Sequence, residues 1–195
     1  MPPPNKMATP CVASRPVSVC RQIPGYIPYT ASVYIVWGKR REAYEALQPL
    51  LAGPTIGAWE GLFGAILADE LGNTDERNRI LAAIVERADE SRKASRRLDT
   101  SLNNAQLKSA IELAKLYQSA VAASPPRGKL DLKQLDMVIA ALTPAERVPV
   151  EFFAGKLLEK FGEPNEAKKH YEVAMKGYPR YYLSVLASMR HRGIP

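Results

Sequence analysis

Residues 155–179 read GKLLEKFGEPNEAKKHYEVAMKGYP, and the glycine and proline residues in this stretch divide it into two helical segments. Gly162 follows an apolar run with helical spacing, and glycine suits the left-handed residue that ends a helix. Pro164 falls at an early position of the next helix, where its missing amide hydrogen costs nothing. Pro179 then stops that second helix. The stretch therefore predicts a hairpin of two antiparallel helices.

The seam of this hairpin is predicted by residues of alternating size. Ala167, Tyr171 and Ala174 are spaced to lie on one face of the second helix, so that one aromatic ring packs between two small residues. Gly155 has no side chain and lets the helices approach closely at its position. We expect Ala167 to lie at the closest approach, facing Gly155 and Leu158.

The same spacing recurs twice nearer the N-terminus. It is found over residues 31–50 around Gly38 and over residues 65–84 around Gly72, and the two glycines are 34 residues apart. The second copy departs from the pattern, because Arg77 stands where a small residue is expected. The interval from Gly72 to the glycine that ends the first helix of the opening stretch is 90 residues, which is not a multiple of 34. The array therefore loses its register in the middle.

The chain resembles the tetratricopeptide (TPR) repeat family in a divergent form. The resemblance rests on these glycines, the pair Glu166-Ala167, Tyr171 and Pro179. The resemblance covers residues 25–91 and 148–182 and is strongest in the second range, where eight signature positions match. It implies helical hairpins of 34 residues each that stack on one another, because one repeat cannot bury both of its faces. We therefore predict an all-α protein, a short and irregular α-solenoid of antiparallel helical hairpins.

The middle of the chain carries its own helix signals. Asn73 with Glu76 predicts a capping box at the start of a long helix over 75–97, and a second helix is expected over 104–123. Asp131 is expected to cap a shorter helix that runs through Leu142. The run Thr143-Pro144-Ala145-Glu146 places a cap, a first-turn proline and a reciprocal glutamate in order.

These signals divide the chain into four segments. They are a proline-rich, basic, disordered tail (1–24), two TPR-like hairpins (25–99), an irregular helical pair (100–147), and a TPR hairpin with a terminal helix (148–195). Cys11 and Cys20 both lie in the tail, and two cysteines do not make a disulfide framework or a four-ligand zinc site. The tail carries no uninterrupted apolar stretch of a secretory signal, and no run is long enough to cross a membrane. We expect a soluble, cytoplasmic protein.

The net charge of +7 is concentrated at the N-terminus. Residues 1–41 contain six basic and no acidic side chains, so the other 154 residues, with 21 basic and 20 acidic side chains, carry a balance of +1. A helical run over 86–97 ends in a basic cluster, Arg92, Lys93, Arg96 and Arg97. Its acids and bases interleave as on a solvent-exposed helix. Nucleic-acid binding through this cluster and the tail is therefore the alternative function rather than the leading one.

No catalytic motif is present in the sequence. His170 and Glu166 are spaced i,i+4, but two ligands do not make a metal site and the neighbouring lysines repel cations. The sequence also lacks a phosphate-binding glycine loop and a nucleophile elbow. We expect no enzymatic activity, no cofactor and no bound metal.

The leading hypothesis is a noncatalytic protein–protein interaction module that binds a protein or peptide. The resemblance implies a concave wall built from the first helices of the repeats. One subset of the family holds a partner's terminal carboxylate on this wall with an Asn/Lys/Arg clamp, and the matching positions here (Pro28, Ser32, Phe63, Phe152 and Phe153) do not carry it. The alternative for the wall is that the tail or a neighbouring helix covers it. The expected partner-binding residues are Trp59, Leu62, Ile66, Phe152, Lys156 and Lys160.

Overall fold

The computed structural model describes residues 27–53, 56–94, 104–122, 129–176 and 182–193. The expectations for the tail and its two cysteines lie outside these ranges. Over the described residues the chain forms helices and no strand, which confirms the all-α class. The helices are α1 (Ile27–Val36), α2 (Arg40–Leu51), α3 (Ala58–Glu70), α4 (Thr74–Ala94), α5 (Asn104–Ala122), α6 (Leu132–Ala140), α7 (Pro144–Lys160), α8 (Pro164–Met175) and α9 (Tyr182–His191).

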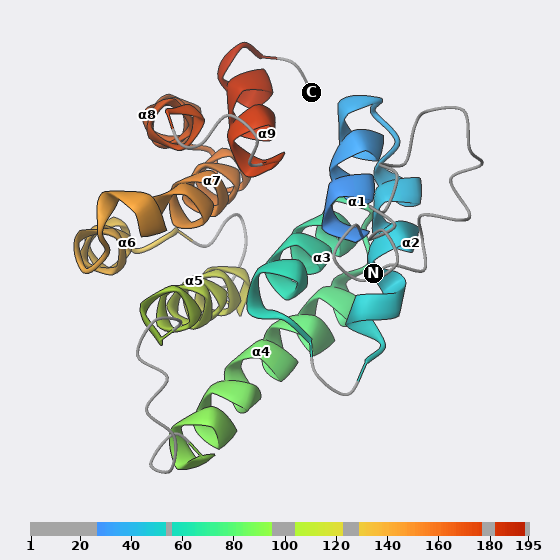
Figure 1. The fold of residues 1–195 in the computed structure, drawn as a ribbon, viewed down its shortest axis with the longest axis vertical. Coiled ribbons are helices and arrows are strands. Elements are labelled where there is room, and N and C mark those ends of the chain that lie inside the picture. The colour runs from blue at the N-terminus through green and yellow to red at the C-terminus, as the bar shows by residue number, and fades with distance from the viewer. Residues whose placement is uncertain (1–26, 54–55, 95–103, 123–128, 177–181, 194–195) are drawn as a thin grey trace, which may run out of the picture.

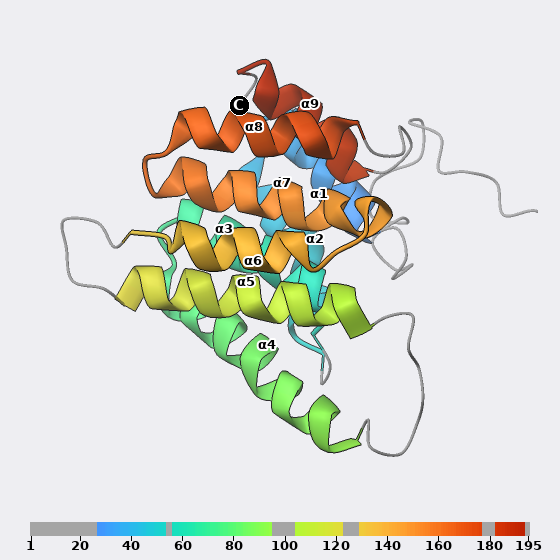
Figure 2. The ribbon, with the colours of Figure 1, turned by 90° about the vertical axis from the view of Figure 1, so that its left-hand side faces the viewer.

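The helices stack mainly in chain order. Each of the pairs α1–α2, α3–α4 and α7–α8 packs as neighbours, and α2–α3, α4–α5 and α8–α9 continue the stack. In Figure 2, α8, α7, α6 and α5 lie one below another as a layer, with α1, α2 and α3 behind them. This arrangement is a short solenoid-like stack, as predicted.

The stack also folds back on itself. Helix α7 contacts α3 and α5, and α9 contacts α1, so helices far apart in sequence meet (Figure 1). Below, α1–α4 are called the N-terminal half and α5–α9 the C-terminal half. The segment limit that we expected between residues 147 and 148 falls inside α7, which begins at Pro144.

The three glycines that the repeat spacing singled out end helices in the left-handed conformation. The φ angles are 71° at Gly38, 78° at Gly72 and 86° at Gly162. The amide of the following residue then donates back to the helix, as in the 2.8 Å bond from Glu163 N to the Leu158 carbonyl. This is the hydrogen-bond pattern that satisfies carbonyls at a helix end.

The predicted caps of α6 and α7 are present. Asp131 accepts a hydrogen bond from the Gln134 amide at 3.1 Å, and α6 ends two residues before the expected Leu142. At α7, the Glu146 carboxylate accepts from the Thr143 amide at 3.0 Å and from the Thr143 hydroxyl at 2.6 Å. These contacts supply partners for polar groups at the helix start.

The box predicted at α4 is only half formed. The Asn73 side chain accepts from the Glu76 amide at 3.2 Å. The Glu76 carboxylate instead accepts from Arg79 at 2.6 Å and from the Tyr44 hydroxyl of α2 at 2.9 Å. A tertiary contact therefore replaces the reciprocal local one.

The seam between α7 and α8 places Tyr171 against Gly155. Ala167, Tyr171 and Ala174 are all fully buried, which fits the predicted face. The three heavy atoms nearest to a Cβ at Gly155 belong to Tyr171, the first of them at 2.5 Å. The missing side chain of Gly155 therefore makes room for the tyrosine ring.

Candidate functional site

Three of the residues expected on a partner-binding wall are buried. Leu62 is fully buried, and 4% of Ile66 and 2% of Phe152 are exposed. Leu62 and Ile66 lie on α3, Phe152 lies on α7, and these two helices pack against each other. These three side chains therefore lie inside the protein and not on an open wall.

The other three expected residues lie at the edge of this contact. Trp59 is partly buried and stacks on Phe153, with 5.5 Å between ring centroids and 12° between ring planes. The side chains of Lys156 and Lys160 are 13% and 32% exposed, and both reach across to α3. The two halves are therefore joined by apolar contacts inside and by ion pairs further out.

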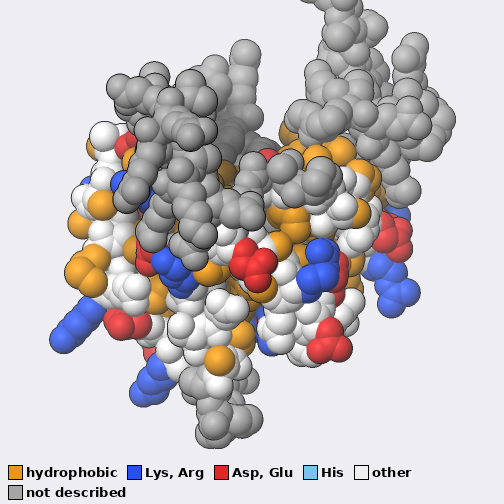
Figure 3. Space-filling view, turned by 90° about the horizontal axis from the view of Figure 1, so that it is seen from below, with side chains coloured by type: hydrophobic (Ala, Val, Ile, Leu, Met, Phe, Trp, Pro, Cys, Tyr) orange, Lys and Arg blue, Asp and Glu red, His pale blue; other side chains and the backbone are white. Residues whose placement is uncertain are grey.

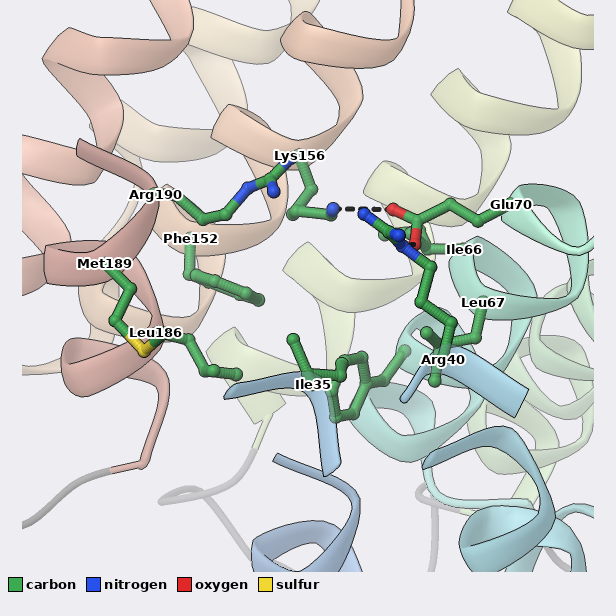
Figure 4. Close-up of a pocket in the computed structure, with 11 residues that line it drawn as sticks. Ile35, Arg40, Ile66, Leu67, Glu70, Phe152, Lys156, Leu186, Met189 and Arg190 are labelled. Carbon is green, nitrogen blue, oxygen red and sulfur yellow. Dashed lines mark hydrogen bonds and ion pairs between the residues drawn. The ribbon is translucent and has the colours of Figure 1, made fainter. Parts of the chain in front are cut away.

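A cleft remains between the halves, and it is the candidate site. We call it the central cleft (Figure 4). Its inner part is a hollow of about 30 Å³, and its mouth has a volume of about 220 Å³. Residues of α1, α2 and α3 line one side, and residues of α7 and α9 line the other. The hollow and the mouth share four lining residues, Ile66, Glu70, Lys156 and Arg190.

The floor of the central cleft is apolar and its mouth is charged. In Figure 4, Lys156 and Arg190 lie along the upper edge of the hollow, and apolar side chains lie below them. The floor is lined by Ile35, Phe63, Leu67, Phe152, Leu186 and Met189. A hollow of this size has room for about two water molecules, but a buried water needs two to four polar partners.

Glu70, the last residue of α3, is paired across the cleft. Its carboxylate accepts from Lys156 Nζ of α7 at 2.6 Å and from Arg40 Nε of α2 at 3.0 Å. Burial by itself would raise the pKa of Glu70, but the charge and hydrogen bond of Lys156, with the charge of Arg40, hold it below its usual value. Glu70 is therefore an ionised carboxylate that joins three helices.

Asp69 has three partners from three other helices. Its carboxylate accepts from Arg77 Nη1 at 2.7 Å, from the Tyr117 hydroxyl at 2.5 Å and from Lys160 Nζ. Burial acts to raise the pKa of Asp69, yet the hydrogen bonds from Lys160 and Tyr117 lower it overall. The same contact acts in the opposite sense on Tyr117, where burial and then the hydrogen bond to Asp69 raise the pKa of the phenol.

The third carboxylate of the mouth, Glu159, belongs to the C-terminal half. It accepts from Arg190 Nη2 of α9 at 2.7 Å and from the Tyr171 hydroxyl of α8 at 2.9 Å. Burial, then the charge of Glu159, raise the pKa of Tyr171. Arg190 is thus fixed on the rim of the central cleft by a partner on its own side.

Cations outnumber carboxylates in this network. Five cationic side chains pair with three carboxylates, which leaves a formal excess of two positive charges. The cations are Arg40, Arg77, Lys156, Lys160 and Arg190, and the carboxylates are Asp69, Glu70 and Glu159.

Sequence reasoning found the two lysines of α7 but missed their partners. Asp69 and Glu70 lie just before the turn at Gly72, and neither they nor Arg190 were among the expected binding residues. The pairing of Lys156 with Glu70 spans 86 residues. A signal was available in the adjacent acids at the end of α3, but repeat spacing reports on local hairpins and not on this contact.

The metal and nucleic-acid alternatives gain no site from the described residues. His170 Nδ1 lies 2.6 Å from Glu151 Oε2, whereas Glu166 binds Lys169. No group of three or more His, Cys, Asp or Glu side chains that could hold a metal ion occurs in the part of the chain that the structure describes. The side chains of the cluster from Arg92 to Arg97 lie outside that part.

The surface seen from below is mixed in charge. Lys and Arg side chains are interspersed there with Asp and Glu over the described residues (Figure 3). No helix among the described residues is both long and apolar enough to cross a bilayer. Comparison of the chain with protein-family models, curated proteins and solved structures gives no match.

Proposed function

We propose that this chain is a noncatalytic protein–protein interaction module, related to TPR proteins, that binds a protein or peptide at the central cleft. The observation that carries the proposal is the cleft itself, an apolar floor with a cationic mouth between the two halves. Binding sites combine apolar surface with a few polar groups that fix orientation. Four of the residues first expected on the wall line the cleft, namely Ile66, Phe152, Lys156 and Lys160, whereas Trp59 and Leu62 do not.

The architecture also supports this proposal. Solenoid-like stacks of helical hairpins present extended surfaces to partners. The cleft lies between helices of both halves, so a bound segment would contact α3, α7 and α9 together. The charged groups at its mouth are held in place by paired contacts, so a partner would meet a preorganised surface.

A displayed library of random peptides tests the function. Peptides selected on the intact chain are measured against two variants that each remove one lysine, Lys160→Ala at the mouth and Lys168→Ala on the exposed face of α8. We expect Lys160→Ala to weaken the selected peptides at least tenfold and Lys168→Ala to leave them unchanged. Thermal melts of both variants confirm that each remains folded. Selection of no peptide, or equal binding to both variants, would contradict the proposal.

A further inference from the structure

The central cleft places apolar surface and surplus positive charge next to each other. Of the cations at its mouth, Lys156 and Lys160 come from one face of α7 and Arg190 comes from α9. The hollow that opens beside them is lined mainly by aliphatic and aromatic side chains. A ligand that fits both parts has a negatively charged end and a short apolar end.

The cations at the mouth retain hydrogen-bonding capacity. An ammonium group has three N–H donors and a guanidinium has five. Among the contacts of the described residues, Lys156 gives one bond to Glu70, Lys160 pairs with Asp69, and Arg190 uses Nε and Nη2 on Glu159. Each cation is oriented by its own carboxylate, with donors left for a ligand.

We propose that the central cleft binds an aliphatic carboxylate, with its carboxylate between Lys156, Lys160 and Arg190 and its hydrocarbon chain on the floor. The inference rests on the proposed function for the use of this cleft. It deepens that function by naming the chemistry of the ligand. The lining of the cleft contains four cationic side chains and two carboxylates, an excess of positive charge that favours an anion. Charge-assisted hydrogen bonds to a carboxylate are also the strong ones. The inner volume of about 30 Å³ limits the apolar end to a few carbon atoms.

Nuclear magnetic resonance titrations of the intact chain test this ligand class. The probes are acetate, butyrate, octanoate and butanol at constant ionic strength. Burial of a methylene group improves affinity about fourfold, so butyrate should bind about 15-fold tighter than acetate. Octanoate should gain little more, because its chain exceeds the hollow, and butanol should bind far more weakly than butyrate. Saturable shifts are expected at Lys156, Leu186 and Arg190.

Two pairs of variants separate the charged end of the site from the apolar end. Lys160→Gln should weaken every carboxylate several-fold without affecting butanol, while Lys168→Gln on α8 should change nothing. Met189→Ala should reduce the gain from acetate to butyrate, while Val185→Ala, at an exposed position of the same helix, should preserve it. Equal affinity for acetate and butyrate, equal affinity for butyrate and butanol, or shifts scattered over the surface would overturn the inference.

A peptide titration decides whether the carboxylate belongs to a polypeptide segment or to a free carboxylic acid. A peptide with one internal Glu between two Val residues, in a Gly-Ser context, is compared with its Gln counterpart and with butyrate. Tighter binding of the Glu peptide than of butyrate assigns the site to acidic polypeptide segments. Binding of butyrate alone assigns it to free carboxylic acids and overturns the polypeptide source, together with the interaction role. Library peptides that bind without being displaced by butyrate would uphold the interaction role and overturn this inference.

Discussion

Tyr171 of α8 lies over Gly155 of α7, so closely that a Cβ at position 155 would come within 2.5 Å of the Tyr171 Cε1 atom. The ring has little freedom to move, because it is fully buried and its hydroxyl donates to Glu159 at 2.9 Å. Glu159 in turn holds Arg190 at the rim of the central cleft. This contact in the C-terminal hairpin is therefore linked to the candidate site through the hydrogen bonds of Glu159.

The first prediction is that Gly155→Ala destabilises the protein. Overpacking costs about 1–3 kcal/mol, more than the roughly 0.5–1 kcal/mol that Ala gains over Gly within a helix. Urea unfolding measures the difference. In a Tyr171→Leu background the same change should cost less, because the ring that it meets is gone. Equal costs in the two backgrounds would contradict the assigned contact.

Two neighbouring positions on α8 test its register. Ala167 is fully buried and Lys168 is exposed. Ala167→Leu should cost about 1–3 kcal/mol, because it adds volume to a filled seam. Lys168→Leu should change the free energy of unfolding by no more than about 0.5 kcal/mol, as is usual at the surface. Thermal melts compare the two variants, and equal destabilisation would mean that the register is wrong.

Much of the fold was predictable because its signals are local. The glycine positions, the caps at Asp131 and Thr143, and the buried face of Ala167 and Tyr171 all depend on residues within one or two helical turns. Each such signal fixes a helix end or a face without reference to the rest of the chain. The order and pairing of helices then follow from short connections.

The candidate site was predictable only in part because it forms where the two halves meet. Lys156 and Lys160 were expected on a partner-binding wall, and each is paired with a carboxylate of α3 at the mouth of the central cleft. Phe152 and Leu62 occupy positions that an open array would expose, and both are buried. Spacing within a repeat carries no information on whether a stack closes, and that closure decides which residues remain accessible.

The third prediction compares two tyrosine hydroxyls. Tyr117 donates to Asp69, whose side chain is 6% exposed, and Tyr44 donates to Glu76, whose side chain is 21% exposed. Tyr117→Phe should cost about 1.5–3 kcal/mol, as for a hydrogen bond to a charged and buried group. Tyr44→Phe should cost less, because water reaches Glu76 more readily. Urea unfolding at neutral pH checks the order, and a larger loss for Tyr44→Phe would contradict it.

The fourth prediction concerns acid unfolding. The pKa values of Asp69 and Glu70 lie below their ordinary values of 3.8 and 4.5, so the unfolded chain binds protons more readily than the folded one. The stability that these carboxylates contribute is therefore complete above about pH 4.5 and is lost as the pH falls through the two folded pKa values. Urea unfolding between pH 7 and pH 3 should show this decline.

The variant Lys160→Met tests the cause of this loss of stability at low pH. The hydrogen bond from Lys160 is the strongest of the interactions that lower the pKa of Asp69, whereas burial raises this pKa. Without the lysine, the pKa of Asp69 rises toward or above its unfolded value. The variant should therefore be less stable than the wild type at pH 7 and lose less of its remaining stability on acidification. Lys168→Met, on the exposed face of α8, should follow the wild-type curve at every pH. If the Lys160→Met curve runs parallel to that of the wild type, the ion pair between Lys160 and Asp69 does not contribute to the pH dependence of folding.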